Sequence, residues 1–64
     1  MITDRNGKEL RIGDRVRIVV EKHTYESTVT GFLQGGDEQY VKVSGVQVGG
    51  KWITLVGDWK VEKL

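Results

Sequence analysis

The chain contains no cysteine, no proline, no alanine and only one histidine. Without cysteine it forms neither disulfides nor thiolate metal sites. One histidine is too few to make a zinc ligand set, and no carboxylates cluster around it in the sequence. We therefore expect no metal and no other cofactor. Without a disulfide or a bound metal, a domain of 64 residues must rely on regular packing or on association with another chain for its stability.

Long apolar runs and excess charge are also missing. No apolar stretch approaches the length of a membrane span, and no signal-peptide pattern opens the chain, so a cytoplasmic location is the default expectation. The formal net charge is +1, which is too small for the whole molecule to attract polyanions. Any basic surface must therefore be local.

What the chain does contain favours β-structure. It has ten valines, four isoleucines and five threonines. β-Branched side chains suit a pleated sheet and lose rotamer freedom in helices. The lack of alanine removes the best helix former. Nine glycines are spaced as turn residues. The composition predicts an all-β fold.

Turn signals divide the chain into short strands that alternate apolar and polar residues. Asn-Gly and Gly-Gly pairs are typical of tight hairpins, and an isolated glycine within a strand indicates a bulge. The expected turns are Asn6-Gly7, Gly13-Asp14, residues 34–38 and Gly49-Gly50, with a loop at 22–24, a bulge at Gly31 and a helical turn at 57–59. We predict five or six antiparallel strands that curl into one small barrel domain over residues 1–64, because curling buries an otherwise bare apolar face.

The alternation also assigns side chains to the two faces of the sheet. The expected core comprises Leu10, Val16, Ile18, Val20, Val29, Leu33, Val41, Val43, Ile53, Leu55 and Val61. Val19, Val46, Val48 and Val56 are expected on or near the outer face, where a partner subunit would cover them. We expect Trp59 to plug one end of the barrel and Trp52 to be exposed, because a very small core needs a large side chain.

The first long strand carries a resemblance to a known class. Residues 12–18 read IGDRVRI, a Gly-Asp pair followed by alternating arginine and aliphatic residues. This entry, with the segment 27–45 and the closing WKVEKL, resembles the SH3-like barrels of the KOW and Tudor kind, including many small bacteriophage and prophage proteins. The sequence departs from the KOW pattern at 27–31, where STVTG replaces the Gly-x-Val element. The resemblance implies an SH3-like barrel that binds RNA, DNA, peptides, methylated side chains or larger assemblies.

A basic strand beside aromatic residues is the main candidate site. Small barrels hold single strands of nucleic acid with such a combination. The candidate residues for binding nucleic acid or a partner are Arg11, Arg15, Arg17, Tyr40, Lys42 and Trp52. The alternative interpretation is a solvated strand whose arginines pair with Asp14, Glu21 or Glu26. Residues 21–40 carry one basic and four acidic groups, a net charge of −3, which opposes binding to phosphates.

We therefore predict a non-catalytic module that contacts nucleic acid or a nucleoprotein. The alternative is a protein-interaction module, such as a small phage protein that modulates a host enzyme or assembly, favoured by the near-neutral charge and the acidic 34–38 loop. A homo-oligomer fits either function. A cage of aromatic side chains for a methylated lysine or arginine is a further hypothesis, and an enzymatic function comes third after the two binding functions.

Signals for catalysis or for a calcium site are weak. His23 lies four residues before Ser27, but no orienting acid follows at a set spacing. Residues 43–50 resemble a stretch of the small plasmid-encoded dihydrofolate reductases, with Gln47 matching and Gly49 at the position of the tyrosine. Asp37 and Glu38 lack the ligand spacing of a calcium loop.

Overall fold

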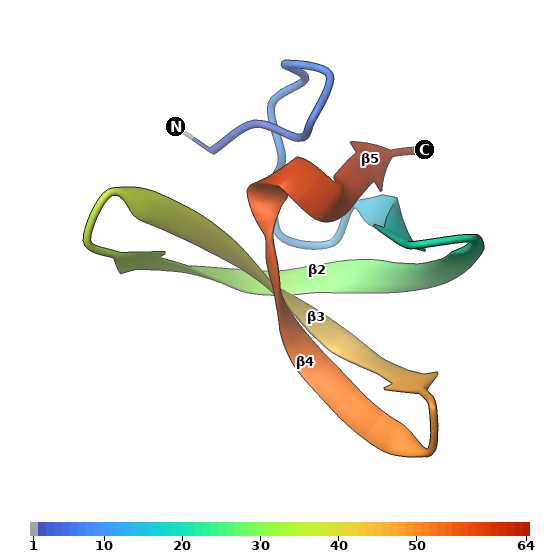
Figure 1. The fold of residues 1–64 in the computed structure, drawn as a ribbon. Helices are drawn as coiled ribbons and strands as arrows, with labels where there is room; N and C mark the ends of the chain where they lie inside the picture. Colours follow the sequence, from blue (N-terminus) through green and yellow to red (C-terminus); the bar gives the residue numbers. More distant parts are fainter. Residues whose placement is uncertain (1) are drawn as a thin grey trace.

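Five antiparallel strands form one sheet in the computed structural model, which describes residues 2–64. The strand order is β4-β3-β2-β1-β5 (Figure 1). The elements are β1 (Arg15–Val20), β2 (His23–Gly35), β3 (Glu38–Val48), β4 (Lys51–Gly57), the 3-10 helix η1 (Asp58–Lys60) and β5 (Val61–Lys63). The predicted all-β class is confirmed. The barrel is not closed, because no ladder within the described residues joins β4 to β5.

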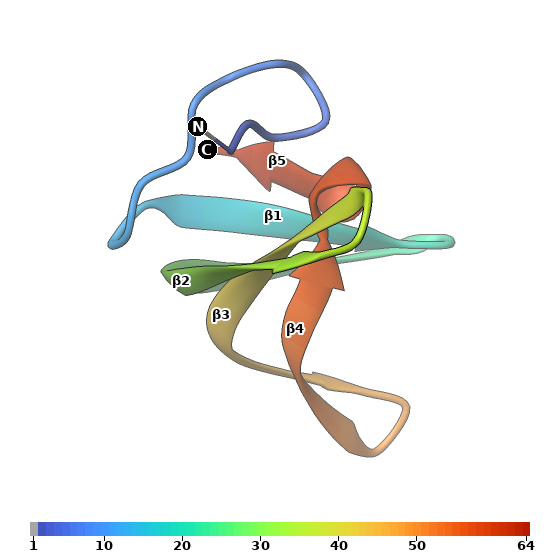
Figure 2. The same cartoon turned by 90° about the vertical axis from the view of Figure 1, so that its left-hand side faces the viewer.

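Three hairpin turns point away from the centre of the sheet in different directions (Figures 1 and 2). Gly49 and Gly50 have φ angles of 58° and 81°, as a tight two-residue turn requires, and this turn is as predicted. The β1–β2 turn is tighter than predicted. Val20 pairs with His23, so the turn consists of Glu21 and Lys22, and His23 begins β2 instead of lying in a loop.

The sheet bends at two breaks in its ladders. The register between β2 and β3 shifts between Val29 and Gly31, which confirms the predicted bulge. The register between β3 and β4 shifts between Lys42 and Val46. At the bend, the hydroxyls of Ser27 and Ser44 form a 2.9 Å hydrogen bond, which satisfies the buried Ser27. β2 therefore contributes its first half to a ladder with β1 and its second half to a ladder with β3.

These breaks change the core from the one predicted. The buried apolar residues are Leu10, Val16, Ile18, Val29, Val41, Val43, Val46, Val56 and Val61. Val46 and Val56 were expected outside and are buried, whereas Leu33 and Leu55 were expected inside and are 45% and 39% exposed. Each break shifts the inside–outside alternation, which a uniform period of two along the sequence does not anticipate. Val20 and Ile53 are partly buried against the core, and so is Val48, which was expected outside.

The N-terminal loop is attached to β5 through one buried carboxylate. The N–H groups of Asn6 and Lys8 donate to Asp4 Oδ1 at 2.9 and 2.8 Å, and the N–H of Lys63 donates to Asp4 Oδ2 at 2.7 Å. The N–H of Arg5 donates to the carbonyl of Val61 at 2.9 Å. In both views the loop lies beside β5 (Figures 1 and 2). It thereby covers part of one edge of the sheet.

Replacing Asp4 with alanine should lower the free energy of unfolding by about 1–3 kcal/mol, because the change leaves three backbone donors without their acceptor. Urea titration monitored by circular dichroism measures this change. An unchanged denaturation midpoint would contradict the assigned role of Asp4.

The stability supplied by Asp4 should depend on pH. Burial of the carboxyl favours its neutral form, but the three N–H donors outweigh burial and lower the pKa of Asp4 from its usual 3.8. Its contribution is therefore complete above pH 3.8 and is lost as the pH falls toward the lower pKa of the folded state. Asp4→Asn should lose less stability than the unmodified chain over that interval in parallel urea titrations, and an equal loss would contradict this account.

Candidate functional site

The arginines of β1 lie on the exposed face of the strand, as predicted, and each is paired with a carboxylate. Arg15 Nη2 lies 3.5 Å from Glu26 Oε1, and Arg15 Nη1 donates to Thr28 Oγ1 at 2.9 Å. Arg17 Nη1 lies 3.7 Å from Glu62 Oε2. Both glutamates are the cross-strand neighbours of β1, on β2 and β5. The basic strip is therefore neutralised locally by the strands on either side.

Arg11 lies apart from the other two arginines, in the loop before β1. Its guanidinium lies 3.3 Å from Glu9, and its backbone N–H donates to Asp14 Oδ2 at 2.9 Å. That N–H donor, with Lys63 at 3.4 Å, lowers the pKa of Asp14 despite some desolvation. Asp14 is therefore an ionised carboxylate that holds the loop against β5. It adds negative charge beside the predicted phosphate site.

The other predicted site residues come from the second half of the sheet. Lys42 is exposed on β3, and its side chain passes over Gly31, where an added Cβ would lie 3.5 Å from Lys42 Cδ. Trp52 is 72% exposed on β4, as predicted, with its ring beside Gly45. Tyr40 is half-buried on β3. The bend in β2 separates these three residues from the arginines, so the six candidates do not form one continuous strip.

Apolar side chains gather instead on the outer face of β2, β3 and β4. Leu33 pairs with Tyr40, and Tyr40 pairs with Gly57, so these residues share one face. One step along the ladders, Lys42 pairs with Leu55 on the same face. We call the set Leu33, Tyr40, Leu55 and Trp59 the aromatic face.

Trp59 was expected to plug the core, but it is 49% exposed and belongs to the aromatic face. It lies in η1, directly after β4, and its indole ring covers Gly57, where an added Cβ would lie within 2.6 Å of the ring. The ring centroids of Tyr40 and Trp59 are 6.1 Å apart at 61°, an edge-to-face contact. Trp59 is therefore held at the surface by two neighbours.

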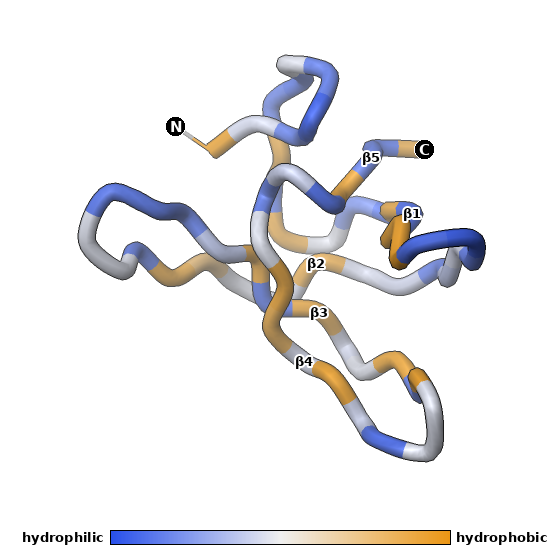
Figure 3. Tube along the Cα trace, viewed as in Figure 1, coloured by the Kyte–Doolittle hydropathy of each residue, from blue (hydrophilic) through white to orange (hydrophobic). Residues whose placement is uncertain are grey.

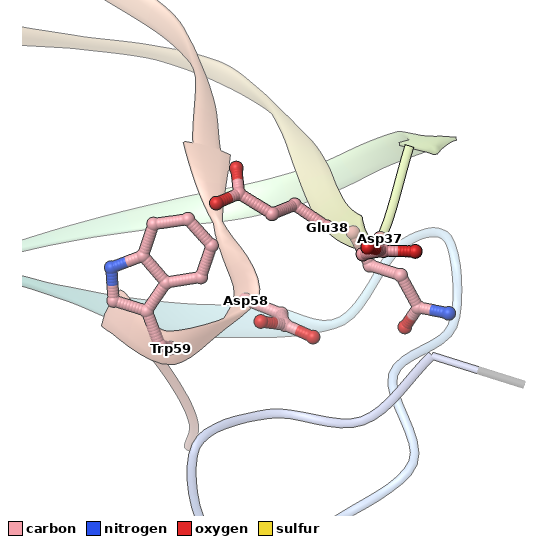
Figure 4. A pocket seen from close by; sticks show the side chains of 5 residues that line it. Asp37, Glu38, Asp58 and Trp59 are labelled. Atoms are coloured by element: carbon pink, nitrogen blue, oxygen red, sulfur yellow. The ribbon is translucent and has the colours of Figure 1, made fainter. Parts of the chain in front are cut away.

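A cavity of about 350 Å³ opens beside Trp59. Its lining residues are Asp37, Glu38, Gln39, Asp58 and Trp59 (Figure 4). The turn before β3 and the start of η1 meet here, so three carboxylates and an indole line the same cavity. The Tyr40 hydroxyl donates to Glu38 Oε2, and this bond raises the pKa of Tyr40. The cavity has the chemistry to receive a cation, because carboxylates and the face of an indole both attract positive charge.

Sequence reasoning missed this cavity. Asp37 and Glu38 were expected in an acidic turn that favours a protein partner, but not as part of a cavity. Asp58 and Trp59 lie in η1, directly after β4, and the β3–β4 pairing of Tyr40 with Gly57 brings the two turns together. In the sequence, the only indication of this cavity is that acidic and aromatic residues lie close together at both turns.

His23 and Ser27 are not arranged as a base and a nucleophile. The Ser27 hydroxyl is buried and hydrogen-bonded to Ser44. His23 lies four residues away on the same strand, about 13 Å along it, which is too far to act as the base for Ser27. In the part of the chain that the structure describes, no three histidine or carboxylate side chains converge on a possible metal position. Likewise, no helix over residues 2–64 has the length and apolarity to cross a membrane.

No protein-family model matches this chain, and neither curated proteins nor solved structures give a match. The function proposed for the chain therefore rests on the residues and contacts described above.

Replacing Gly57 with alanine should displace Trp59 from the aromatic face. Gly57 has φ −69° and ψ 148°, which alanine adopts freely, so only the contact with the indole is disturbed. Because Trp59 is half exposed, its ring can rotate outward, and we expect a loss of stability of about 1 kcal/mol. Tryptophan fluorescence should shift to the red. An unchanged emission spectrum would contradict the contact between Gly57 and Trp59.

Proposed function

We propose that this domain is a non-catalytic binding module of the SH3-like kind that docks a protein partner through the aromatic face. The observation that carries the proposal is the outward position of Leu33, Leu55 and Trp59 on one face of the sheet, next to Tyr40. Contiguous exposed apolar side chains on a small domain are typical of interaction surfaces. Tryptophan and tyrosine are also over-represented among the residues that dominate binding energy.

The charges around this face indicate the chemistry of the partner. The cavity beside Trp59 carries Asp37, Glu38 and Asp58, whereas Lys42 lies on the face itself, opposite Leu55. A partner segment with apolar residues and one arginine or lysine matches this surface, since its cation enters the acidic cavity while its apolar residues cover the sheet. A host enzyme or assembly with such a segment is the partner class that the resemblance to phage barrels implies.

The strand order and the helical turn before the last strand support the SH3-like assignment that residues 12–18 suggested. The fold itself does not select a ligand, because barrels of this class bind many kinds of partner. The ion pairs of the three arginines are a second reason to favour a protein partner over nucleic acid. Arg11, Arg15 and Arg17 each already contact a glutamate.

A library of random peptides displayed on phage tests the proposal. We expect selected peptides to combine apolar residues with at least one arginine or lysine. Trp59→Ala and Leu55→Ser should weaken their binding at least about tenfold, because both changes remove contact area at the centre of the face. Isothermal titration calorimetry measures these affinities.

The control is the double variant Arg15→Ala with Arg17→Ala, which alters the other half of the sheet and should bind the peptides as the unmodified chain does. Circular dichroism confirms that each variant folds. Peptides that bind the Trp59 and Leu55 variants with full affinity would overturn the proposal.

Nucleic acid is the second candidate ligand. The observation that favours it is the exposure of Arg15 and Arg17, whose side chains are 57% and 44% accessible on adjacent positions of one face. Surface ion pairs with glutamate contribute little to stability, so phosphate groups can replace the carboxylates at small cost.

This second function predicts a salt-dependent affinity for labelled single-stranded DNA or RNA, measured by fluorescence anisotropy. Replacing either arginine with alanine should reduce the slope of log affinity against log salt by about one. Glu62→Gln should strengthen binding, since Glu62 lies near both Arg17 and Arg5. Absence of binding at low salt, or a slope that neither arginine changes, would exclude nucleic acid as the ligand of this face.

A further inference from the structure

The two end strands of the sheet differ in how their outer edges are covered. At β5, the carbonyl of Val61 accepts the N–H of Arg5, and the N–H of Lys63 donates to Asp4. At β4, the backbone pairs with β3 alone, and within residues 2–64 no backbone bond reaches its other edge. β4 therefore presents a row of N–H and C=O groups to solvent.

The sequence of β4 does not protect this edge. Natural edge strands usually carry charges, proline or a bulge that prevents pairing with another chain. Residues 52–57 carry none of these charges, and the chain has no proline. The irregularity of the β3–β4 ladder places the extra residues in β3, so no bulge within β4 blocks its free edge. Figure 3 shows hydrophobic segments along β4.

The turn before β4 determines which of its backbone groups face outward. Residues that flank a two-residue hairpin turn form a hydrogen-bonded pair, here Val48 with Lys51. Backbone groups of successive residues alternate in direction, so those of Trp52 and Thr54 point away from β3. A second strand that pairs with these groups would extend the sheet.

We propose that the strand that pairs here is β4 of a second copy, antiparallel to the first, with the two-fold axis at Thr54. At this register the outward N–H and C=O groups of one β4 face those of the other β4, because Thr54 lies opposite Thr54 of the second copy. Ile53 then lies opposite Leu55, and Trp52 opposite Val56, so each pair is apolar. The strongly exposed Trp52 is covered in this arrangement.

The charges at the ends of β4 favour the same register. Lys51 lies opposite Gly57 of the second copy and beside its Asp58, and the symmetry repeats this contact at the other end. Opposite charges on neighbouring strands stabilise a pair, and like charges destabilise it. Because a two-fold pairing uses both β4 edges and the loop at Asp4 covers β5, the assembly stops at a dimer.

Sedimentation velocity over a range of concentrations tests the proposal, with an expected mass of twice 7.2 kDa at the upper end. Thr54→Pro removes an N–H that faces the second copy and not β3, so it should weaken dimerisation at least about tenfold while the monomer stays folded. Thr54→Val is the matched control, because it keeps both the N–H and the branched side chain. A monomer at all concentrations, or polymers beyond a dimer, would overturn the proposal.

A cross-linking measurement tests the register and does not depend on the proline variant. The chain lacks cysteine, so Thr54→Cys introduces the only thiol, and a disulfide joins two copies only where the two positions meet. Mild oxidation should convert most of this variant to a covalent dimer on a non-reducing gel. Thr24→Cys, at an exposed position on β2, should stay largely monomeric. Equal cross-linking of both variants would contradict pairing at Thr54.

Failure of the dimer leaves the proposed function intact, because peptide binding depends on side chains of the aromatic face, whereas dimerisation depends on backbone groups at the edge of β4. The peptide affinity of Thr54→Pro, measured by calorimetry, tests the binding function separately from the dimer. This affinity should equal that of the unmodified chain.

Discussion

Two breaks in the β-ladders, at residues 29–31 of β2 and 42–46 of β3, determine which side chains this domain buries and which it exposes. They bend one sheet so that its halves enclose a core of small β-branched side chains. The same breaks shift the alternation along the strands. Leu33 and Leu55 therefore point outward, and Val46 and Val56 take their place inside. The exposed apolar surface is thus a direct consequence of the way the core is enclosed.

Local signals in the sequence predict the strands and most of their turns, because each turn depends on a few adjacent residues. Gly49 and Gly50 occupy the left-handed region that the hairpin demands, and Asn6-Gly7 closes a loop whose ends meet at the Thr3–Glu9 bridge. The inside–outside assignment fails beyond each break, since a bulge changes the face of every residue that follows until the next irregularity. The position of Trp59 depends on Gly57 and on the β3–β4 register, which are long-range features that periodicity does not contain.

The distinction between local signals and long-range features also applies to the candidate site. The outward position of Arg15 and Arg17 follows from alternation within one strand. Their partners do not, because Glu62 reaches Arg17 only through the pairing of β5 with β1, across more than forty residues of sequence. A count of charges over a segment therefore overstates the basic character of β1. What distinguishes a phosphate site from a solvated strand is the set of carboxylates that the tertiary fold places within reach.

β4 contributes to two surfaces, because its side chains form part of the face and its backbone groups form the edge. Leu55 lies on the aromatic face, whereas the backbone groups of Thr54 lie on the edge. Pairing at that edge brings the aromatic faces of two copies into one assembly at a fixed separation. A partner that carries two matching segments would then bind both faces, and the second contact becomes intramolecular, with a gain in avidity that needs no new residue. For a domain with so small a core, association through a strand edge thus increases the buried area and the binding strength together.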